Sequence, residues 1–293
     1  ADPSNGFTTD TLSVGQVPTC LAAFDYLSAD SLDDLVVGFE INSSLDGGFE
    51  IFAASSTLRG VGFTNVQTLG MNSAPINVDP SEDEKDKDIP FAGSRRDGRA
   101  VSARVSFARG PGLSLDEYPA GADLGGIVVG DINNDGFADM VLTSRTNNSI
   151  PILIQDSANP GEFLPALQVP AGLNPSGITI IDFDSDGNND IATITTSEVS
   201  SDRIVRVLQN DGNLTFTSID LAEGEFPLLV DSGDVNGDGT NDLVTIGDSG
   251  SLLRNGDASP VLALRKGETS CDCSGDVDCN GSIDIDDLLA VLS

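Results

Sequence analysis

The sequence contains no histidine or tryptophan and only two tyrosines. Without histidine the chain lacks the side chain that most often acts as a general acid or base, and no Gly-x-Ser-x-Gly nucleophile motif is present. A lectin is disfavoured because sugar sites normally expose aromatic rings. We therefore expect a non-enzymatic protein. A polysaccharide lyase or hydrolase with a carboxylate pair is the alternative that stays open.

Basic residues are also scarce. Lys and Arg number 14 against 47 Asp and Glu, so the formal net charge is −33. This charge argues against nucleic acids and anionic membranes as partners, because phosphates need cations. No apolar run reaches the roughly 18–20 residues of a membrane-spanning helix, so no membrane insertion is expected. Hydrophobic residues still make up 39% of the chain, which favours a folded core over a disordered acidic tail.

Cysteine is limited to four residues, Cys20, Cys271, Cys273 and Cys279. The even number and the cluster near the tail predict disulfides in an oxidising compartment. Zinc is disfavoured because the C-x-C-x5-C spacing comes without histidine. The first residue is Ala1, which agrees with a removed signal peptide or with an expression scar. We expect an extracellular protein, and a bridge from Cys20 to Cys271 or Cys273 would tie its first repeat to its last.

An acidic segment recurs along the chain. GDINNDGFADMVL (130–142) resembles IDFDSDGNNDIAT (181–193) and GDVNGDGTNDLVT (233–245). The last aspartates of these segments, Asp139, Asp190 and Asp242, are spaced by 51 and 52 residues. The same step backwards reaches two degenerate copies that end at Asp88 and Asp34. Five copies at an even period predict a repeat architecture.

Each repeat reads as four short strands. In the third repeat these are 126–130, 140–143, 150–155 and 163–169, with the acidic segment between the first two. Four antiparallel strands in about 50 residues form one blade of a β-propeller, whereas a β-sandwich domain needs about twice that length. We predict an all-β propeller of about five four-stranded blades over residues 1–268 and a separate tail over 269–293.

The acidic segments follow the pattern D-x-[DN]-x-D-G-x-x-D. In a tight turn the side chains at positions one, three, five and nine converge, and the backbone carbonyl of position seven joins them. Oxygen ligands in that number suit Ca²⁺, although Asp-Gly and Asn-Gly also favour metal-free turns. Without a cation the carboxylates would raise one another's pKa, so we predict calcium in three loops. The predicted ligands are Asp131, Asn133, Asp135, Phe137 and Asp139, then Asp182, Asp184, Asp186, Asn188 and Asp190, then Asp234, Asn236, Asp238, Thr240 and Asp242.

The two early copies depart from this pattern. The copy at 24–39 has Leu27 and Ala29 at ligand positions, so no metal is expected there. The copy at 78–93 has Lys85 and Lys87 among its acids, and their ammonium groups can take the place of a cation; weak calcium binding there is the alternative.

The three regular loops, each followed by DMVL, DIAT or DLVT, resemble FG-GAP/VCBS-type repeats over about residues 7–268. The resemblance implies calcium-bound blades of an extracellular propeller, like the one in the head of integrin alpha chains. It also implies a role in adhesion. Propellers of this family usually have seven such repeats.

The tail carries a second calcium pattern. In GDVDCNGSIDIDDLLAVLS (275–293) the positions of an EF-hand-like loop are filled, and an amphipathic helix is expected at 285–292. This segment resembles one half of a dockerin module, and dockerins bind cohesin domains through two such loops. The alternative is a calcium-stapled cap on the propeller. The predicted ligands of this fourth ion are Asp276, Asp278, Asn280, Ser282, Asp284 and Asp287.

Three segments are candidate contacts with a protein partner or with another copy of the chain. A spare strand at 7–14 can pair with an open sheet edge, although 260–265 also reads as the last strand of the fifth blade. Seven of the fourteen basic residues lie at 85–109, in a hairpin that either contacts an acidic neighbour or is solvated. The tail is the third. We expect a secreted calcium-binding propeller in adhesion or in an extracellular assembly or fibre.

Overall fold

The computed structural model describes residues 14, 16–24, 34–41, 46–57, 60–71, 75–80, 91–95, 97–106, 112–199, 202–221, 227–234 and 240–247. Several predicted features lie outside these residues. They are the N-terminal strand at 7–14 apart from Val14, the parts of the first two acidic segments at 25–33 and 81–90, the strand at 260–265 and the tail at 269–293.

The described residues form eighteen strands and no helix. The strands are β1 (Val17–Phe24), β2 (Asp34–Glu40), β3 (Gly47–Thr57), β4 (Gly60–Met71), β5 (Pro75–Pro80), β6 (Phe91–Arg95), β7 (Arg99–Ser106), β8 (Gly112–Pro119), β9 (Leu124–Gly130), β10 (Asp139–Ser144), β11 (Ser149–Leu153), β12 (Leu167–Pro170), β13 (Ile178–Ile181), β14 (Asp190–Thr196), β15 (Arg203–Asn210), β16 (Phe216–Leu221), β17 (Pro227–Gly233) and β18 (Asp242–Gly247). Within this described part, no helix is long and apolar enough to cross a membrane.

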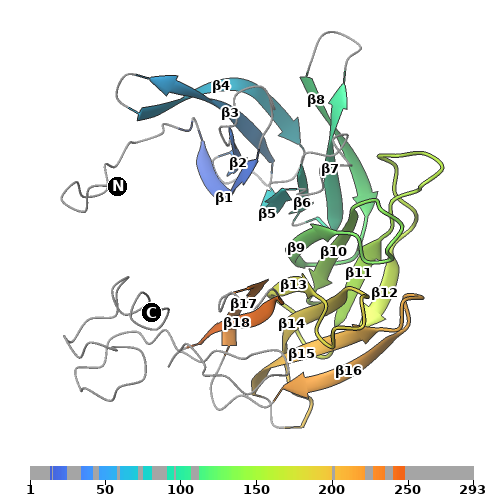
Figure 1. Ribbon diagram of the computed structural model, residues 1–293. Helices are drawn as coiled ribbons and strands as arrows, with labels where there is room; N and C mark the ends of the chain where they lie inside the picture. Colours follow the sequence, from blue (N-terminus) through green and yellow to red (C-terminus); the bar gives the residue numbers. More distant parts are fainter. Residues whose placement is uncertain are drawn as a thin grey trace, which may run out of the picture.

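Consecutive strands pair into antiparallel sheets, as predicted. β1–β4, β5–β8, β9–β12 and β13–β16 each form a four-stranded sheet, and β17 pairs with β18 in a fifth. The sheets follow one another around an arc, with the first strand of each on the inner side and β4, β8, β12 and β16 on the outer side (Figure 1). Each of the inner strands β1, β5, β9 and β13 contacts the first strand of the next blade, the last of these contacts being with β17. This is the arrangement of β-propeller blades.

The hydrophobic core is divided into layers between neighbouring blades. Val36 of the first blade and Val101 of the second belong to one core cluster, and Ala92 of the second and Met140 of the third belong to the next. The same holds between the third and fourth blades and between the fourth blade and β17–β18. Among the described residues, the second, third and fourth sheets therefore bury both of their faces against neighbouring sheets, and each core layer is shared by two blades.

The second strand of each blade explains the apolar runs that follow the acidic loops. All six residues of β10 are buried, and six of the seven residues of β14 are buried. Strands that are covered on both faces need continuous apolar residues instead of alternation. The runs MVL and IAT after Asp139 and Asp190 meet this need.

The strand boundaries differ from the prediction at the outer edge of the third blade. β12 begins at Leu167, whereas the sequence suggested a strand from Phe163. Phe163 makes only an isolated bridge with Gln155. Pro165 lies between the two segments and has no backbone N–H for the ladder, which accounts for the shorter strand.

Candidate metal centres

The loop between β9 and β10 folds around its own acidic side chains. Asp131 Oδ1 accepts the backbone N–H of Asp135 at 3.1 Å, and Oδ2 accepts that of Gly136 at 2.8 Å. Asn133 Oδ1 accepts a further bond from the Asp135 N–H at 3.0 Å. Asp135 Oδ1 in turn accepts the N–H of Phe137 at 2.9 Å. The side chains at positions one, three and five therefore all fold back over the turn.

The loop between β13 and β14 repeats this geometry. Asp182 accepts the N–H groups of Asp186 and Gly187, both at 3.1 Å. Asp184 Oδ1 accepts the Asp186 N–H at 3.3 Å, and Asp186 Oδ1 accepts the N–H of Asn188 at 2.8 Å. The hydrogen bonds match the previous loop position by position.

Both loops also use left-handed backbone at the same two places. Gly136 and Gly187 each have a φ of 89°, which glycine adopts without a steric penalty. Asn134 and Ser185, two residues earlier, have φ of 60° and 59°. Asn134 and Ser185 are different residue types, but their backbone conformation is the same. The shared D-x-[DN]-x-D-G positions therefore determine the turn.

The last aspartate of each loop is buried. Asp139 and Asp190 are both 0% exposed. In each, both carboxylate oxygens accept a backbone N–H, one from the loop and one at or just after the third strand of the blade. The donors are Ile132 (3.1 Å) and Gln155 (2.8 Å) for Asp139, and Phe183 (2.9 Å) and Asn210 (2.8 Å) for Asp190. Each carboxylate thus joins its loop to the interior of its blade.

Burial dominates the electrostatics of these aspartates. It raises the pKa of Asp139 to about 7, and the nearby charges of Asp135 and Asp131 add smaller increases. The pKa of Asp190 is raised for the same reason, first by burial and then by its acidic neighbours. Mutual repulsion, which the sequence suggested as the cause, is therefore the lesser contribution. A charged carboxylate at these positions needs a positive partner near neutral pH.

Three carboxylates of the fourth-blade loop converge. Ligand oxygens of Asp182, Asp184 and Asp190 all lie within 4.8 Å of one another. These are positions one, three and nine of the pattern, while Asp186 at position five stands outside the group. In the third blade position three is Asn133, whose amide oxygen is the equivalent donor.

This donor set fits calcium. Carboxylate and amide oxygens are hard ligands, and an oxygen that accepts one N–H keeps a second lone pair. Asp182, Asp184 and Asp190 would hold the ion in the fourth blade, and Asp131, Asn133 and Asp139 are the counterparts in the third. The ion would supply the positive charge that the buried carboxylates need.

The remaining predicted ligands are described only in part. Asp242 begins β18 and is 1% exposed, which matches Asp139 and Asp190. Asp234 and Thr240 are also described, whereas Asn236 and Asp238 lie outside the described residues. The tail ligands at 276–287 and three of the four cysteines lie outside them as well. Cys20, on β1, forms no disulfide with any described residue.

Residues 131–193 match the family model described as FG-GAP-like repeat. The match covers the acidic loops of the third and fourth blades and the segment that joins them. No curated protein sequence matches the chain.

Solved structures resemble the chain in fold. A chain in the crystal structure of BBS1N in complex with ARL6DN has 15% sequence identity and a TM-score of 0.50. The match covers 82% of this chain and 66% of that chain. A protein from Lactobacillus plantarum has 15% identity, a TM-score of 0.51, and coverage of 88% and 73%. Chaetomium thermophilum Sqt1, bound to the N-terminus of the ribosomal protein L10, has 13% identity, a TM-score of 0.52, and coverage of 85% and 63%. The chain thus spans about two thirds of these proteins, and the likeness concerns the fold alone.

Asparagines that the sequence did not single out connect the two FG-GAP-like loops. Asn189 Nδ2 donates to the carbonyl oxygen of Asp131 at 2.7 Å. In the other direction, Asn134 Nδ2 donates to the carbonyl oxygen of Gly187 at 3.1 Å. The sequence does show asparagine at the variable positions of both loops. It could not show that Asn189 and Asn134 have their hydrogen-bond partners in the neighbouring blade.

Proposed function

We propose that this chain is a calcium-stabilised, non-enzymatic propeller that holds interaction surfaces in place in extracellular adhesion or assembly. The observation that carries the proposal is the pair of loops in the third and fourth blades. They share one hydrogen-bonding pattern, and in the second of them Asp182, Asp184 and Asp190 bring their oxygens within 4.8 Å of one another.

Calcium would supply the positive charge that compensates the buried carboxylates of the acidic loops. Each loop places several carboxylates next to a buried strand, and its last aspartate has no exposed surface. Burying an ionised carboxylate is unfavourable unless an opposite charge compensates it. Calcium modules outside the cell typically have dissociation constants of about 10⁻⁴–10⁻³ M, so secretion and calcium dependence support each other.

A binding role accords with the absence of histidine and with the behaviour of the structural neighbours. BBS1N was crystallised with ARL6DN, and Sqt1 with the N-terminus of L10. Those partners belong to those proteins. They show that propeller-like folds of this kind present surfaces to other proteins, which supports a similar use here.

Calcium titration calorimetry on the full chain, after chelation and dialysis, tests the metal part of the proposal. We expect uptake by the propeller loops and a higher melting temperature with calcium. D182N/D184N should lose the ion of the fourth blade. D211N is the matched control, because Asp211 Oδ1 also accepts two backbone N–H groups in an exposed turn, from Asn213 and Thr215, but outside the acidic loops. No uptake and an unchanged melting temperature would contradict the proposal.

The assembly part has its own test. Light scattering with calcium and with chelator, on the whole chain and on a chain that lacks residues 1–14, should show self-association that needs both calcium and the N-terminal strand. A screen on acidic polysaccharides tests the enzymatic alternative, and turnover there would overturn the non-enzymatic role. Specific binding on a glycan array would indicate a lectin instead.

A further inference from the structure

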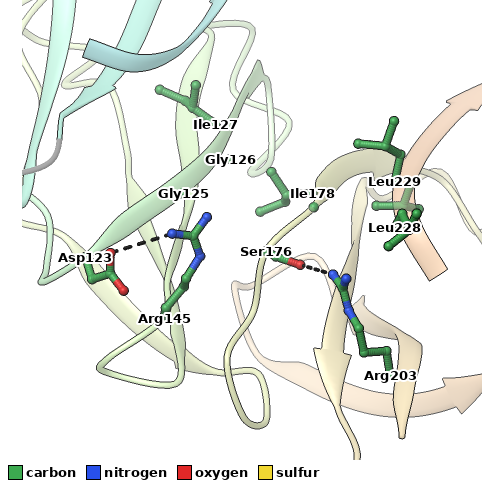
Figure 2. Close-up of a pocket in the computed structure, with 12 residues that line it drawn as sticks. Asp123, Gly125, Gly126, Ile127, Arg145, Ser176, Ile178, Arg203, Leu228 and Leu229 are labelled. Atoms are coloured by element: carbon green, nitrogen blue, oxygen red, sulfur yellow. Dashed lines mark hydrogen bonds and ion pairs between the residues drawn. The ribbon is translucent and has the colours of Figure 1, made fainter. Parts of the chain in front are cut away.

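A pocket of about 510 Å³ opens among the third, fourth and fifth blades (Figure 2). It is lined by the beginnings of β9, β13 and β17 and by two arginines, Arg145 and Arg203. The acidic loops follow the other ends of the same three strands, so the pocket and the loops lie at opposite ends. Its volume is within the roughly 300–1,000 Å³ that is usual for small-ligand sites.

The first arginine has a loose ion pair. Arg145 Nη1 lies 3.6 Å from Asp123 Oδ1, and the two side chains are 44% and 51% exposed. Charge-assisted hydrogen bonds are usually about 2.7–2.9 Å long, so this contact leaves the guanidinium donors largely uncommitted. A ligand carboxylate can compete for them.

The second arginine has a neutral partner. Arg203 Nη2 donates to Ser176 Oγ at 2.8 Å. In the described part of the chain no carboxylate lies within ion-pair distance of Arg203, whereas Arg95, Arg99 and Arg206 each have at least one. Acidic residues outnumber basic ones 47 to 14, so a guanidinium without an acidic partner is unexpected here.

The walls of the pocket are partly apolar and partly glycine. Leu228 and Leu229 of β17 are 45% and 60% exposed and line it. Counted back along the strand register, Leu229 takes the place that Gly126 has in β9 and that Gly177 has just before β13. The fifth blade therefore contributes an aliphatic side chain at a position where the other two blades have a glycine packed closely against the next blade.

Glycine also makes room for the first arginine. A Cβ atom on Gly125 would lie 2.7 Å from Thr143 Oγ1 and 3.2 Å from Arg145 Nη2. The guanidinium thus lies close against bare backbone, inside the pocket. Figure 2 shows Arg145 and Arg203 on the two sides of Ser176, with Leu228 and Leu229 beyond.

We propose that this pocket binds a carboxylate that is carried next to an aliphatic group. Guanidinium groups pair with carboxylates through parallel hydrogen bonds, and the leucines cover the apolar neighbour. Two sources have this chemistry, a small organic acid and the free C-terminus of a peptide that ends in an aliphatic residue. The proposal does not depend on calcium, because none of the pocket residues belongs to the acidic loops.

Ligand-observed NMR and calorimetry on the full chain with three probes test the chemistry. N-acetyl-L-leucine has both features, N-acetyl-L-leucinamide lacks the carboxylate, and acetate lacks the aliphatic group. We expect only the first to bind measurably. Equal binding of the amide overturns the role of the arginines, and equal binding of acetate overturns the role of the leucines.

A second comparison distinguishes a small organic acid from a peptide C-terminus. A pentapeptide with a free C-terminal leucine is compared with its C-terminal amide. If the free peptide binds more tightly than N-acetyl-L-leucine, the ligand is a peptide terminus.

Variants locate the site. R145M/R203M should bind N-acetyl-L-leucine about tenfold more weakly or worse, as expected for lost hydrogen bonds to a charged group. R99M is the matched control, because Arg99 is also 44% exposed with a loose acidic partner, Glu117 at 3.9 Å. L229G introduces the glycine that the third and fourth blades have at the equivalent positions, Gly126 and Gly177, and should remove the preference for N-acetyl-L-leucine over acetate. Circular dichroism confirms the fold of each variant. Unchanged binding in R145M/R203M and unchanged preference in L229G would refute the proposal.

Discussion

Asn210 donates its side-chain N–H to the carbonyl oxygen of Ile132 at 2.9 Å, across the boundary between the fourth and third blades. The same group donates to Asn189 O at 3.1 Å, and its Oδ1 accepts the N–H groups of Gly212 and Leu214, both at 3.1 Å. The Asn210 backbone N–H also donates to Asp190. One buried amide therefore connects both acidic loops to the end of β15.

Replacing Asn210 with alanine should destabilise the protein. The substitution leaves buried backbone groups unpaired, and each such group costs about 1–3 kcal/mol. We expect a lower melting temperature and an unfolding free energy reduced by roughly that amount or more, in calcium and in chelator alike. N213A is the control, since Asn213 is an exposed amide in the next turn. Equal melting temperatures for the two variants would show that the Asn210 bridge contributes nothing.

The two acidic loops should influence each other's calcium affinity. Asn189 Nδ2 bonds the backbone of Asp131, and Asn134 Nδ2 bonds Gly187, so ordering of one loop restrains the other. D182N/D184N should weaken binding in the third-blade loop about fivefold or more, a usual size for coupled sites. In N189A this effect should shrink, as calorimetry of each variant would reveal. N159A, an exposed amide of the β11–β12 loop, serves as the control. Identical third-blade affinities in all variants would rule out coupling.

The metal-free protein should become less stable as the pH rises. The pKa of Asp139 is raised to about 7 by burial, above its value in the unfolded chain, so folding favours the protonated form. The stability from this group is fully present below about pH 4 and is lost as the pH rises through about 7, a difference on the order of 4 kcal/mol. Chemical denaturation in chelator at pH 5 and pH 8 covers most of this loss, an expected decrease of about 2.7 kcal/mol in the unfolding free energy.

In D139N this pH dependence should be flatter, whatever the absolute stability of the variant. Asp190, with a pKa raised in the same direction, leaves a residual slope. D211N should keep the wild-type profile. A chelated wild-type protein that is equally stable at both pH values would contradict the assignment.

Calcium removal should act on the loops before the sheets. The amides of Asp135 and Asp186 bond only to side-chain oxygens within their own loops, whereas β10 and β14 are buried between blades. Local opening is easiest where few buried contacts hold the backbone. Hydrogen exchange with and without chelator should show faster exchange in both loops and little change in β10 and β14. A uniform increase across the blades would mean that calcium stabilises the whole fold and not the turns.

The sequence by itself determined the blade period and the conformation of the acidic loops. Asp131 bonds N–H groups four and five residues ahead, and Asp182 does the same, so the donors and acceptors of each turn lie within one short segment. The buried second strands could also be predicted from the sequence, because a strand covered on both faces needs an unbroken apolar run.

Only the tertiary structure decided how the loops and the pocket are joined. Asn210 meets Ile132 across 78 residues and Asn189 meets Asp131 across 58, and no local pattern marks an asparagine for a partner one blade away. Arg145 and Arg203 likewise share a pocket only because β9, β13 and β17 come together on the inner side of the arc. The raised pKa of Asp139 has the same origin, since the packing of neighbouring sheets removes its carboxylate from water.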